Sequence, residues 1–323
     1  MVTVLKDRQT IIEAFDKVIN NLEKSILGMY NSRLRAIITD PLFMVLHIDD
    51  HMAHRGHAVF DTLTVHEGLA YNLPSHLSRI ITSASLAQIA LPLTPEEISS
   101  ILLDLAASTG KLNLYIRYWI SSGPGSFAIT PVEGESTFYA VAYESNYLEK
   151  FENINEFTVS VPLKPKLLAN MKSNNYMLNA LSAMESSSKG GLFGVQKDEN
   201  GFITEGCVNN FAFVLPNKIF VTPTFDKILK GTGISRTLEL VKSLVNEKLL
   251  DGIEQRDIHI DEAKTAVEML CFCGDGVLGV LNWDGNPVGN GEEGEITKKI
   301  KEMYIGDFFN TEMTVPIDYS KYS

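Results

Sequence analysis

Apolar and polar positions follow two different periods along the chain, and the longer period predicts helices. Between residues 8 and 27 the apolar positions recur on one helix face, with Thr10 and Glu13 forming a capping box. Ser75 and Thr94 are expected to cap two later helices, because each precedes an apolar periodic stretch. The expected helices are 8–27, 75–89, 94–108, 178–188, a helix ending at 244, and 295–306.

The shorter period, together with runs of β-branched and aromatic residues, predicts strands. The expected strands are 42–46, 69–73, 115–120, 136–143, 157–161, 190–195, 202–205, 211–215, 219–223 and 267–278. These strands do not alternate regularly with the helices, which argues against a doubly wound parallel sheet. The pattern therefore predicts an α+β fold, with an irregular tail after residue 310.

The length of the chain favours more than one hydrophobic core. A chain of 323 residues exceeds the usual size of a single core. The composition becomes polar and charged over residues 144–150, so we expect the domain boundary there. The sequence thus predicts an N-terminal helical extension (1–30), a small α/β domain (31–147) and a large domain (148–323). A linker between two domains is a common setting for a ligand cleft.

Charge and cysteine content exclude several classes of partner. The net charge of −12 argues against nucleic acid or an anionic membrane as a partner. No apolar run approaches the roughly 20 residues that span a bilayer. The first residues carry Asp7, Glu13 and Asp16 and lack a basic start, so we expect no targeting peptide and a cytoplasmic location. The three cysteines are expected to be reduced and buried.

The candidate chemistry centres on Lys172 and Glu205, which lie 33 residues apart. Lys172 precedes Asn174-Asn175-Tyr176 and a predicted helix, and Glu205 ends a predicted strand. Lys164 and Lys166 compete for the role of a reactive amine. They flank Pro165 in an extended stretch that we expect to be exposed, so Lys172 is the preferred candidate.

This pair resembles the core of the class IV pyridoxal-phosphate-dependent aminotransferases, which include the branched-chain and D-amino-acid enzymes. The resemblance extends from about residue 37 to 305 and includes Arg79, Asn210 and the Gly233–Ser235 turn, in the same order. It implies the two-domain fold type IV and pyridoxal 5'-phosphate as cofactor. It also implies that Lys172 attaches to the cofactor aldehyde and moves protons, while Glu205 keeps the pyridine nitrogen protonated.

The resemblance implies further cofactor contacts. Tyr176 is expected at the phenolic oxygen of the cofactor, and Arg79, in a His-Leu-Ser-Arg-Ile element, at its phosphate. Gly233, Ile234 and Ser235 are similar to a Gly-Ile-Thr turn that binds phosphate, and a helix N-terminus attracts anions on physical grounds alone. The phosphate-binding residues also include the positions of Gly274 and Asp275, where the family has threonine or serine. A carboxylate repels a phosphate, so we expect Asp275 to point away and backbone N–H groups to replace the hydroxyl.

Three residues are candidates for substrate binding. Arg117 stands in a strand suited to burial and therefore needs an anion, either the substrate carboxylate or an internal salt bridge. His54 and Arg55 precede Val59-Phe60-Asp61, similar to a pocket segment of the family in which glutamate replaces the aspartate. The histidines at 51, 54 and 57 could instead suggest a metal site. We favour a turn into a strand and expect no metal.

The resulting hypothesis is an aminotransferase that exchanges an amino group between an amino acid, branched-chain or D, and a 2-oxo acid. The family resemblance implies a homodimer. A lyase of the same fold, similar to aminodeoxychorismate lyase, shares the cofactor residues and stays open as a second hypothesis. A non-catalytic binding protein with this fold and a metal hydrolase built on the histidines also stay open.

Overall fold

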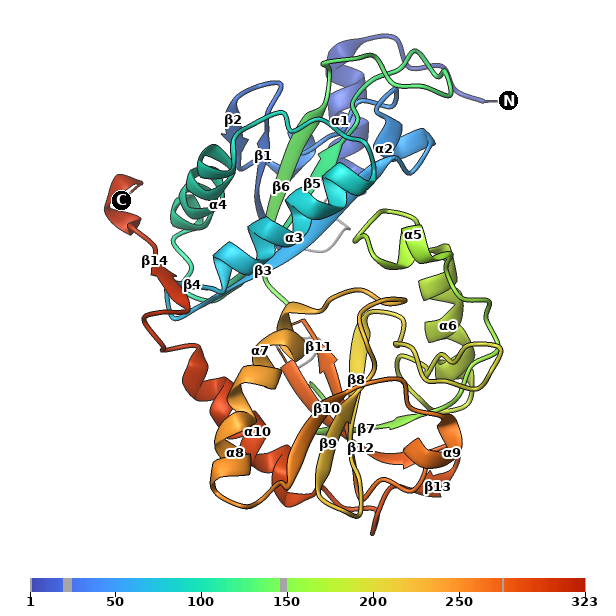
Figure 1. The fold of residues 1–323 in the computed structure, drawn as a ribbon. Helices are drawn as coiled ribbons and strands as arrows, with labels where there is room; N and C mark the ends of the chain where they lie inside the picture. Colours follow the sequence, from blue (N-terminus) through green and yellow to red (C-terminus); the bar gives the residue numbers. More distant parts are fainter. Residues whose placement is uncertain (1, 20–24, 146–149, 275, 323) are drawn as a thin grey trace. The chain divides into compact units, whose positions relative to one another are not determined.

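The chain folds into two units, each with its own sheet. The computed structural model describes residues 2–19, 25–145, 150–274 and 276–322. One unit contains Met1–Ser145 together with Thr314–Ser323, and the other contains Asn146–Met313 (Figure 1). The boundary expected at residue 147 falls on residues 146–149, which lie outside the described residues.

The described residues of the first unit form a seven-stranded antiparallel sheet in the order β14-β4-β3-β5-β6-β1-β2. Its strands are β1 (Ile26–Asn31), β2 (Ala36–Ile38), β3 (Ala58–His66), β4 (Leu69–Tyr71), β5 (Leu114–Ser121), β6 (Thr137–Tyr143) and β14 (Thr314–Pro316). Its helices are α1 (Arg8–Ile19), η1 (Pro41–Phe43), α2 (His51–His54), α3 (Leu73–Leu86), α4 (Pro95–Thr109) and η3 (Tyr319–Lys321). Buried residues of α3 and α4, such as Ile80 and Leu102, join the sheet residues in one core.

The C-terminal segment belongs to the first unit, whereas the sequence pattern placed everything from residue 148 in the large domain. Strand β14 pairs with the edge strand β4, so the tail is not irregular. Tyr319 Oη donates to the carbonyl of Lys111 at 2.7 Å, and Lys321 pairs with Asp104 at 3.0 Å. The short strand carries little periodicity of its own, which is why the sequence pattern missed it.

The second unit is built around a mixed sheet, which the described residues form in the order β10-β9-β8-β11-β12-β13, with β7 also paired to β12. Its strands are β7 (Asn153–Glu156), β8 (Asn209–Val214), β9 (Ile219–Thr222), β10 (Gly252–Gln255), β11 (Glu268–Cys273), β12 (Gly276–Trp283) and β13 (Asn286–Pro287). Its helices are α5 (Lys166–Ala169), α6 (Met177–Ser188), α7 (Thr232–Leu240), α8 (Lys242–Asn246), α9 (Ile260–Ala263) and α10 (Glu295–Asp307). Two units of helices on antiparallel and mixed sheets confirm the α+β prediction.

Strongly periodic elements lie where the sequence predicts them, and weaker ones do not. Helix α4 starts after Thr94, which caps it as expected, and Glu97 completes a capping box that was not predicted from the sequence. The first helix is shorter than predicted: α1 ends at Ile19, residues 20–24 lie outside the described residues, and Ile26 begins β1. Asp7, rather than a box of Thr10 and Glu13, caps α1 by accepting the Thr10 N–H at 2.8 Å. None of its residues is buried.

Several strand and cap predictions are wrong. Residues 42–46 contain the end of η1, and Phe43 is 46% and Val45 60% exposed, so the apolar run is not a buried strand. The strand predicted at 157–161 lies instead at β7, and residues 190–205 form only isolated bridges. Helix α3 begins after Asn72, whose φ of 51° is left-handed, so Ser75 lies within the helix.

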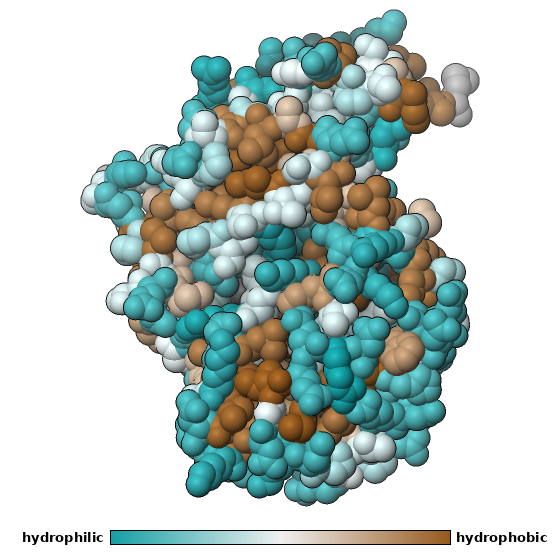
Figure 2. All heavy atoms as spheres, in the orientation of Figure 1, coloured by the Kyte–Doolittle hydropathy of each residue, from teal (hydrophilic) through white to brown (hydrophobic). Residues whose placement is uncertain are grey.

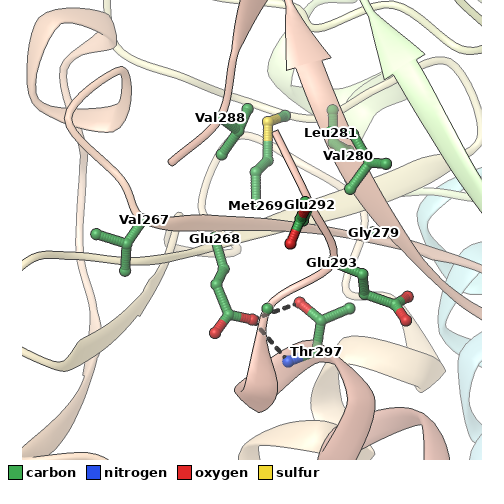
Figure 3. A pocket seen from close by; sticks show the side chains of 11 residues that line it. Val267, Glu268, Met269, Gly279, Val280, Leu281, Val288, Glu292, Glu293 and Thr297 are labelled. Carbon is green, nitrogen blue, oxygen red and sulfur yellow. Dashed lines mark hydrogen bonds between the residues drawn. The ribbon is translucent and has the colours of Figure 1, made fainter. Parts of the chain in front are cut away.

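Glu268 of β11 caps the N-terminus of α10, which has no capping side chain of its own. Its carboxylate accepts the backbone N–H groups of Ile296 and Thr297 at 3.0 and 2.7 Å and the Thr297 hydroxyl at 2.7 Å. The carboxylate borders a small cavity of about 10 Å³ lined by β11, β12 and the start of α10 (Figure 3). A methyl group on Gly294 would collide with this carboxylate at 2.0 Å, so the glycine makes room for the cap.

Glu268→Ala is expected to destabilise the second unit by about 1–3 kcal/mol, because the helix N–H groups lose their acceptor. The measurement is the free energy of unfolding in urea. Glu292→Ala is the matched control, since Glu292 lines the same cavity but is exposed. Equal effects of the two variants would contradict the capping role.

Candidate active site

Two lysines and a glutamate of the second unit lie close to Tyr176. Lys172 Nζ donates to Tyr176 Oη at 3.3 Å and lies 5.9 Å from the centre of that ring. Lys164 Nζ lies 5.8 Å from the same ring centre and 3.3 Å from Glu205 Oε1. The structure therefore brings together Lys172, Tyr176 and Glu205, which the sequence had linked across a turn and a helix.

Glu205 is a buried carboxylate with few partners. The residue is 7% exposed, and its Oε2 accepts the backbone N–H of Leu229 at 3.2 Å. Burial raises the pKa of Glu205 above its ordinary value, and the charges of Lys164 and Lys172 oppose that shift without cancelling it. The site thus contains a carboxylate whose ionisation is incompletely compensated by the protein.

Lys164 contradicts the sequence expectation that it is exposed. Its side chain is 10% exposed and forms the ion pair with Glu205. Pro162 and Pro165 predicted an extended backbone correctly, but extension alone does not show which way a side chain points. The buried partner, 41 positions later in the chain (205 minus 164), gives no local signal in the sequence.

Helix α7 presents its N-terminus without a capping side chain. Its first N–H groups, including those of Gly233 and Ile234, have no partner within the helix by geometry. Ser235 Oγ is buried and makes no hydrogen bond among the described residues. A methyl group on Gly233 would lie 3.0 Å from the carbonyl of Gly274, so glycine allows a close approach here. A hydroxyl and orphan N–H groups at a helix start suit a phosphate group.

Asn210 connects the start of α7, the candidate phosphate-binding cradle, to Glu205. Its Nδ2 donates to the carbonyl of Leu229 at 3.2 Å, and Leu229 in turn donates to Glu205. A methyl group on Gly231 would meet Asn210 Oδ1 at 2.1 Å, so the turn before α7 packs directly on this amide. Gly274, which follows β11, has a φ of +58°, and its carbonyl lies beside Gly233. Asp275 lies outside the described residues.

Arg79 belongs to the first unit, and its guanidinium forms a bidentate ion pair with Asp61. Its Nε and Nη2 donate to the two Asp61 oxygens at 2.7 and 2.6 Å, and His76 Nδ1 lies 3.0 Å from the same carboxylate. Asp61 is fully buried, which opposes its ionisation, but Arg79 and His76 outweigh burial and hold the pKa of Asp61 well below its ordinary value. The sequence motif indicated Arg79 but gave no sign of this partner.

The proposed substrate residues also lie in the first unit. Arg117 is exposed, so the expectation of burial is wrong, since the guanidinium lies on one face of β5 over two aromatic rings. It stands 5.7 Å from the Phe60 ring centre and 5.8 Å from that of Tyr143, and forms no salt bridge among the described residues. His54 Nε2 contacts the Asp49 carbonyl at 3.0 Å, and Arg55 Nη2 donates to the Phe127 carbonyl at 2.6 Å.

The histidine-rich segment forms α2 and a turn into β3, as expected. Within the described ranges no group of three or more His, Cys, Asp or Glu side chains is arranged to hold a metal. His51 is fully buried, and burial lowers its pKa, followed by the nearby His54 and His57. The three cysteines are free and buried. In the part of the chain that the structure describes, no helix has the length and apolarity to cross a bilayer.

Comparison with known proteins assigns the chain to a class of enzymes. The family described as amino-transferase class IV matches residues 58–283, which is more than half of the chain. The chain therefore belongs to the class IV aminotransferases, as its sequence motifs indicate. It is a pyridoxal-phosphate-dependent enzyme that exchanges amino groups between amino acids and 2-oxo acids, and the lyase hypothesis is not favoured.

The similar proteins include a D-amino-acid transaminase and branched-chain-amino-acid aminotransferases. The chain is 39% identical over 287 residues to the D-amino-acid transaminase, chloroplastic, of Arabidopsis thaliana, covering 88% of this chain and 77% of that protein. It is 29% identical over 260 residues to a putative branched-chain-amino-acid aminotransferase of Methanocaldococcus jannaschii, covering 79% of this chain and 88% of that protein. The crystal structure of the Escherichia coli branched-chain enzyme superposes with a TM-score of 0.82 at 20% identity, covering 91% of this chain and 100% of that chain, which shows the same fold.

The residues of the second unit fit pyridoxal phosphate on physical grounds. The unpartnered Ser235 hydroxyl and the glycine at 233 suit the phosphate, and the under-compensated Glu205 carboxylate suits a protonated pyridine nitrogen. The amines of Lys164 and Lys172 lie in the same cluster. The structure thus supplies a basic, an acidic and an anion-binding group within one unit.

Asp61→Asn is expected to destabilise the first unit by about 3–5 kcal/mol, because it leaves the Arg79 cation without its buried counter-charge. Urea unfolding of the full chain is the measurement. The control is Asp104→Asn, which removes an ion pair on the surface and is expected to change little. A loss for Asp61→Asn no larger than the control would show that the buried pair does not stabilise the unit.

Proposed function

We propose that the chain uses D-amino acids as amino donors and 2-oxo acids as acceptors. The observation that carries this proposal is the cluster of Lys172, Tyr176 and Glu205 in a chain 39% identical to a protein named a D-amino-acid transaminase. Branched-chain amino acids are the second candidate, supported by the relatives and solved structures of that name at 29% identity or less.

Lys172 is proposed as the amine that attaches to the cofactor aldehyde. The aldehyde and the ring nitrogen stand at opposite ends of the pyridine ring, so the amine cannot be the lysine that already contacts Glu205. Lys164 makes that contact at 3.3 Å, whereas Lys172 points to the hydroxyl of Tyr176. Both its sequence context and its partner therefore favour Lys172.

The bound cofactor draws electrons from the substrate carbon that carries the amino group, which makes the proton on that carbon acidic. Lys172 is proposed to take this proton and return one, as the general base and acid. Tyr176 Oη accepts a hydrogen bond from Lys172 Nζ at 3.3 Å and so holds the amine in place, and its hydroxyl proton is proposed to be donated to the phenolic oxygen of the cofactor when that is bound. Glu205 holds a proton on the ring nitrogen.

The phosphate is proposed to bind at the start of α7, through Ser235 Oγ and the N–H groups of Gly233 and Ile234. Asn210 and Gly274 shape this cradle by contacting Leu229 and Gly233. Arg79 stays a proposed phosphate ligand, with Asp61 and His76 fixing its orientation. Arg117, His54 and Arg55 stay proposed for the substrate, and the exposure of Arg117 supports contact with a carboxylate.

A homodimer is proposed from the apolar surface of the first unit. Ile48 is 68% and Ile129 81% exposed, and Phe15 of helix α1, which has no buried residue, is 55% exposed. Figure 2 shows apolar atoms at the surface of this unit beside the N-terminal segment. Exposed apolar patches of this kind mark interaction surfaces. A cytoplasmic location is also proposed: three buried free thiols suit a reducing compartment, although one relative is named chloroplastic.

The full chain with its cofactor is expected to absorb at about 410–420 nm and to shift towards about 330 nm with D-alanine but not L-alanine. Lys172→Ala should abolish the shift, while Lys166→Ala, which changes an exposed neighbour, should leave it intact. A shift with L-leucine and none with D-amino acids would favour the branched-chain function instead. Loss of the shift in Lys166→Ala alone would contradict the choice of Lys172.

Light scattering is expected to give a mass about twice 35.8 kDa. Ile48→Glu and Ile129→Glu should shift the protein towards monomer, because each places a charge in the apolar surface. The control is Ile305→Glu, which changes an equally exposed residue of the second unit. A monomeric wild type would contradict the dimer.

A further inference from the structure

We propose that Lys164 is a positioning residue, the counter-ion that fixes the charge and orientation of Glu205. The site would then contain two lysines with separate tasks: Lys172 reacts, and Lys164 acts only through Glu205. This inference rests on the proposed role of Glu205 and extends it to a residue that the sequence motifs do not include.

The contacts of Glu205 single out Lys164. Lys164 Nζ lies 3.3 Å from Glu205 Oε1, and both side chains are about one-tenth exposed, at 10% and 9%. The other carboxylate oxygen is held by the Leu229 N–H at 3.2 Å. Each oxygen thus has one donor from a different segment, which fixes the plane of the carboxylate.

The charged groups that act on Glu205 are the two lysines, and their weights differ. The charge and hydrogen bond of Lys164 and the N–H of Leu229 favour the ionised form, and the charge of Lys172 contributes less than that of Lys164. Both amines lie near the ring of Tyr176, whose centre is 5.8 Å from Lys164 Nζ and 5.9 Å from Lys172 Nζ. Removing Lys164 therefore removes the main cation on this carboxylate.

The backbone around Lys164 is restrained, so the lysine is held at this position. A residue before proline is confined to extended conformations, and Pro165 follows Lys164 directly. Helix α5 (Lys166–Ala169) begins after Pro165, and Asn170 is its C-cap. Asn170 Nδ2 donates to the carbonyls of Phe225 and Ile228 at 2.9 and 3.1 Å, next to the residue that holds Glu205. The segments that hold the two donors to the Glu205 carboxylate, Lys164 and the Leu229 N–H, are therefore joined by hydrogen bonds.

The charge of Lys164 affects whether a proton lies on Glu205 or on the base that Glu205 faces. A cation beside the carboxylate favours the ionised carboxylate over the protonated acid. It therefore favours placing a proton on the base that the carboxylate faces, rather than on Glu205 itself. Lys164 would favour this proton position through its ion pair with Glu205, without contacting the substrate.

The test is the thermal unfolding of the full chain, freed of cofactor, as a function of pH. Glu205 has a raised pKa in the folded protein, so it destabilises the fold above that pKa and not below the unfolded value. Lys164→Met raises this pKa further. Its Tm is therefore expected to fall by about 5–10 °C at about pH 8, and by less at about pH 5, because lowering the pH favours the protonated form of Glu205, which needs no counter-ion.

Three variants separate this role from ordinary packing. Lys164→Arg, which keeps the charge, should recover most of the Tm at about pH 8. Lys166→Met, on the neighbouring exposed lysine, should change the Tm little at any pH. In a Glu205→Gln background, Lys164→Met should no longer lower the Tm, because the lysine has lost its counter-charge.

A Tm loss for Lys164→Met that is the same at both pH values, or that persists in Glu205→Gln, would overturn the proposal. The absorbance test of Lys172→Ala is independent of these measurements. A normal absorbance shift with a pH-independent Tm loss would reject Lys164 as the counter-ion while leaving the proposed function intact. The expected Tm pattern without any absorbance shift would reject the function but not the ion pair.

Discussion

The buried carboxylate of Glu205 is the constraint on which the second unit depends. An ionised carboxylate removed from water needs donors and cations, or it takes up a proton. Here the protein supplies one ammonium and one backbone N–H, and the pKa of Glu205 still stays above its ordinary value. The site is therefore suited to one more cation, and a protonated pyridine ring is such a cation.

Burial raises the pKa of Glu156 as well as that of Glu205, but the other buried carboxylates of the chain have different partners from those of Glu205. Asp61 is more deeply buried than Glu205, but the guanidinium of Arg79 and the ring of His76 hold the pKa of Asp61 well below its ordinary value. Asp50 is satisfied by neutral hydroxyls, including that of Tyr139 at 2.8 Å. Glu156 accepts two backbone N–H groups, at 2.9 and 2.7 Å. Glu205 differs because the cations near it are two lysines, Lys164 and Lys172, whose amines also lie near the ring of Tyr176.

The sequence predicted those elements and contacts that depend on residues close to one another in the chain. Thr94 as a cap predicted the start of α4, and the sequence around Lys172 singled out Lys172 and Tyr176, which the structure places in contact, because each signal depends on neighbouring residues. Contacts between distant segments were not predictable. Nothing in the sequence near Lys164 indicates Glu205, and nothing in the apolar run at 42–46 shows that Phe43 and Val45 lie exposed. The tail strand β14 is defined only by its pairing with β4.

The most direct test of the central claim is the ¹⁵N NMR signal of the pyridine nitrogen in the full chain loaded with ¹⁵N-labelled cofactor. If Glu205 faces that nitrogen as an ionised carboxylate, the signal should be that of a protonated ring throughout the neutral pH range, and Glu205→Gln should change it to that of an unprotonated ring. An unprotonated signal in the wild type, or one that Glu205→Gln leaves unchanged, would contradict the account.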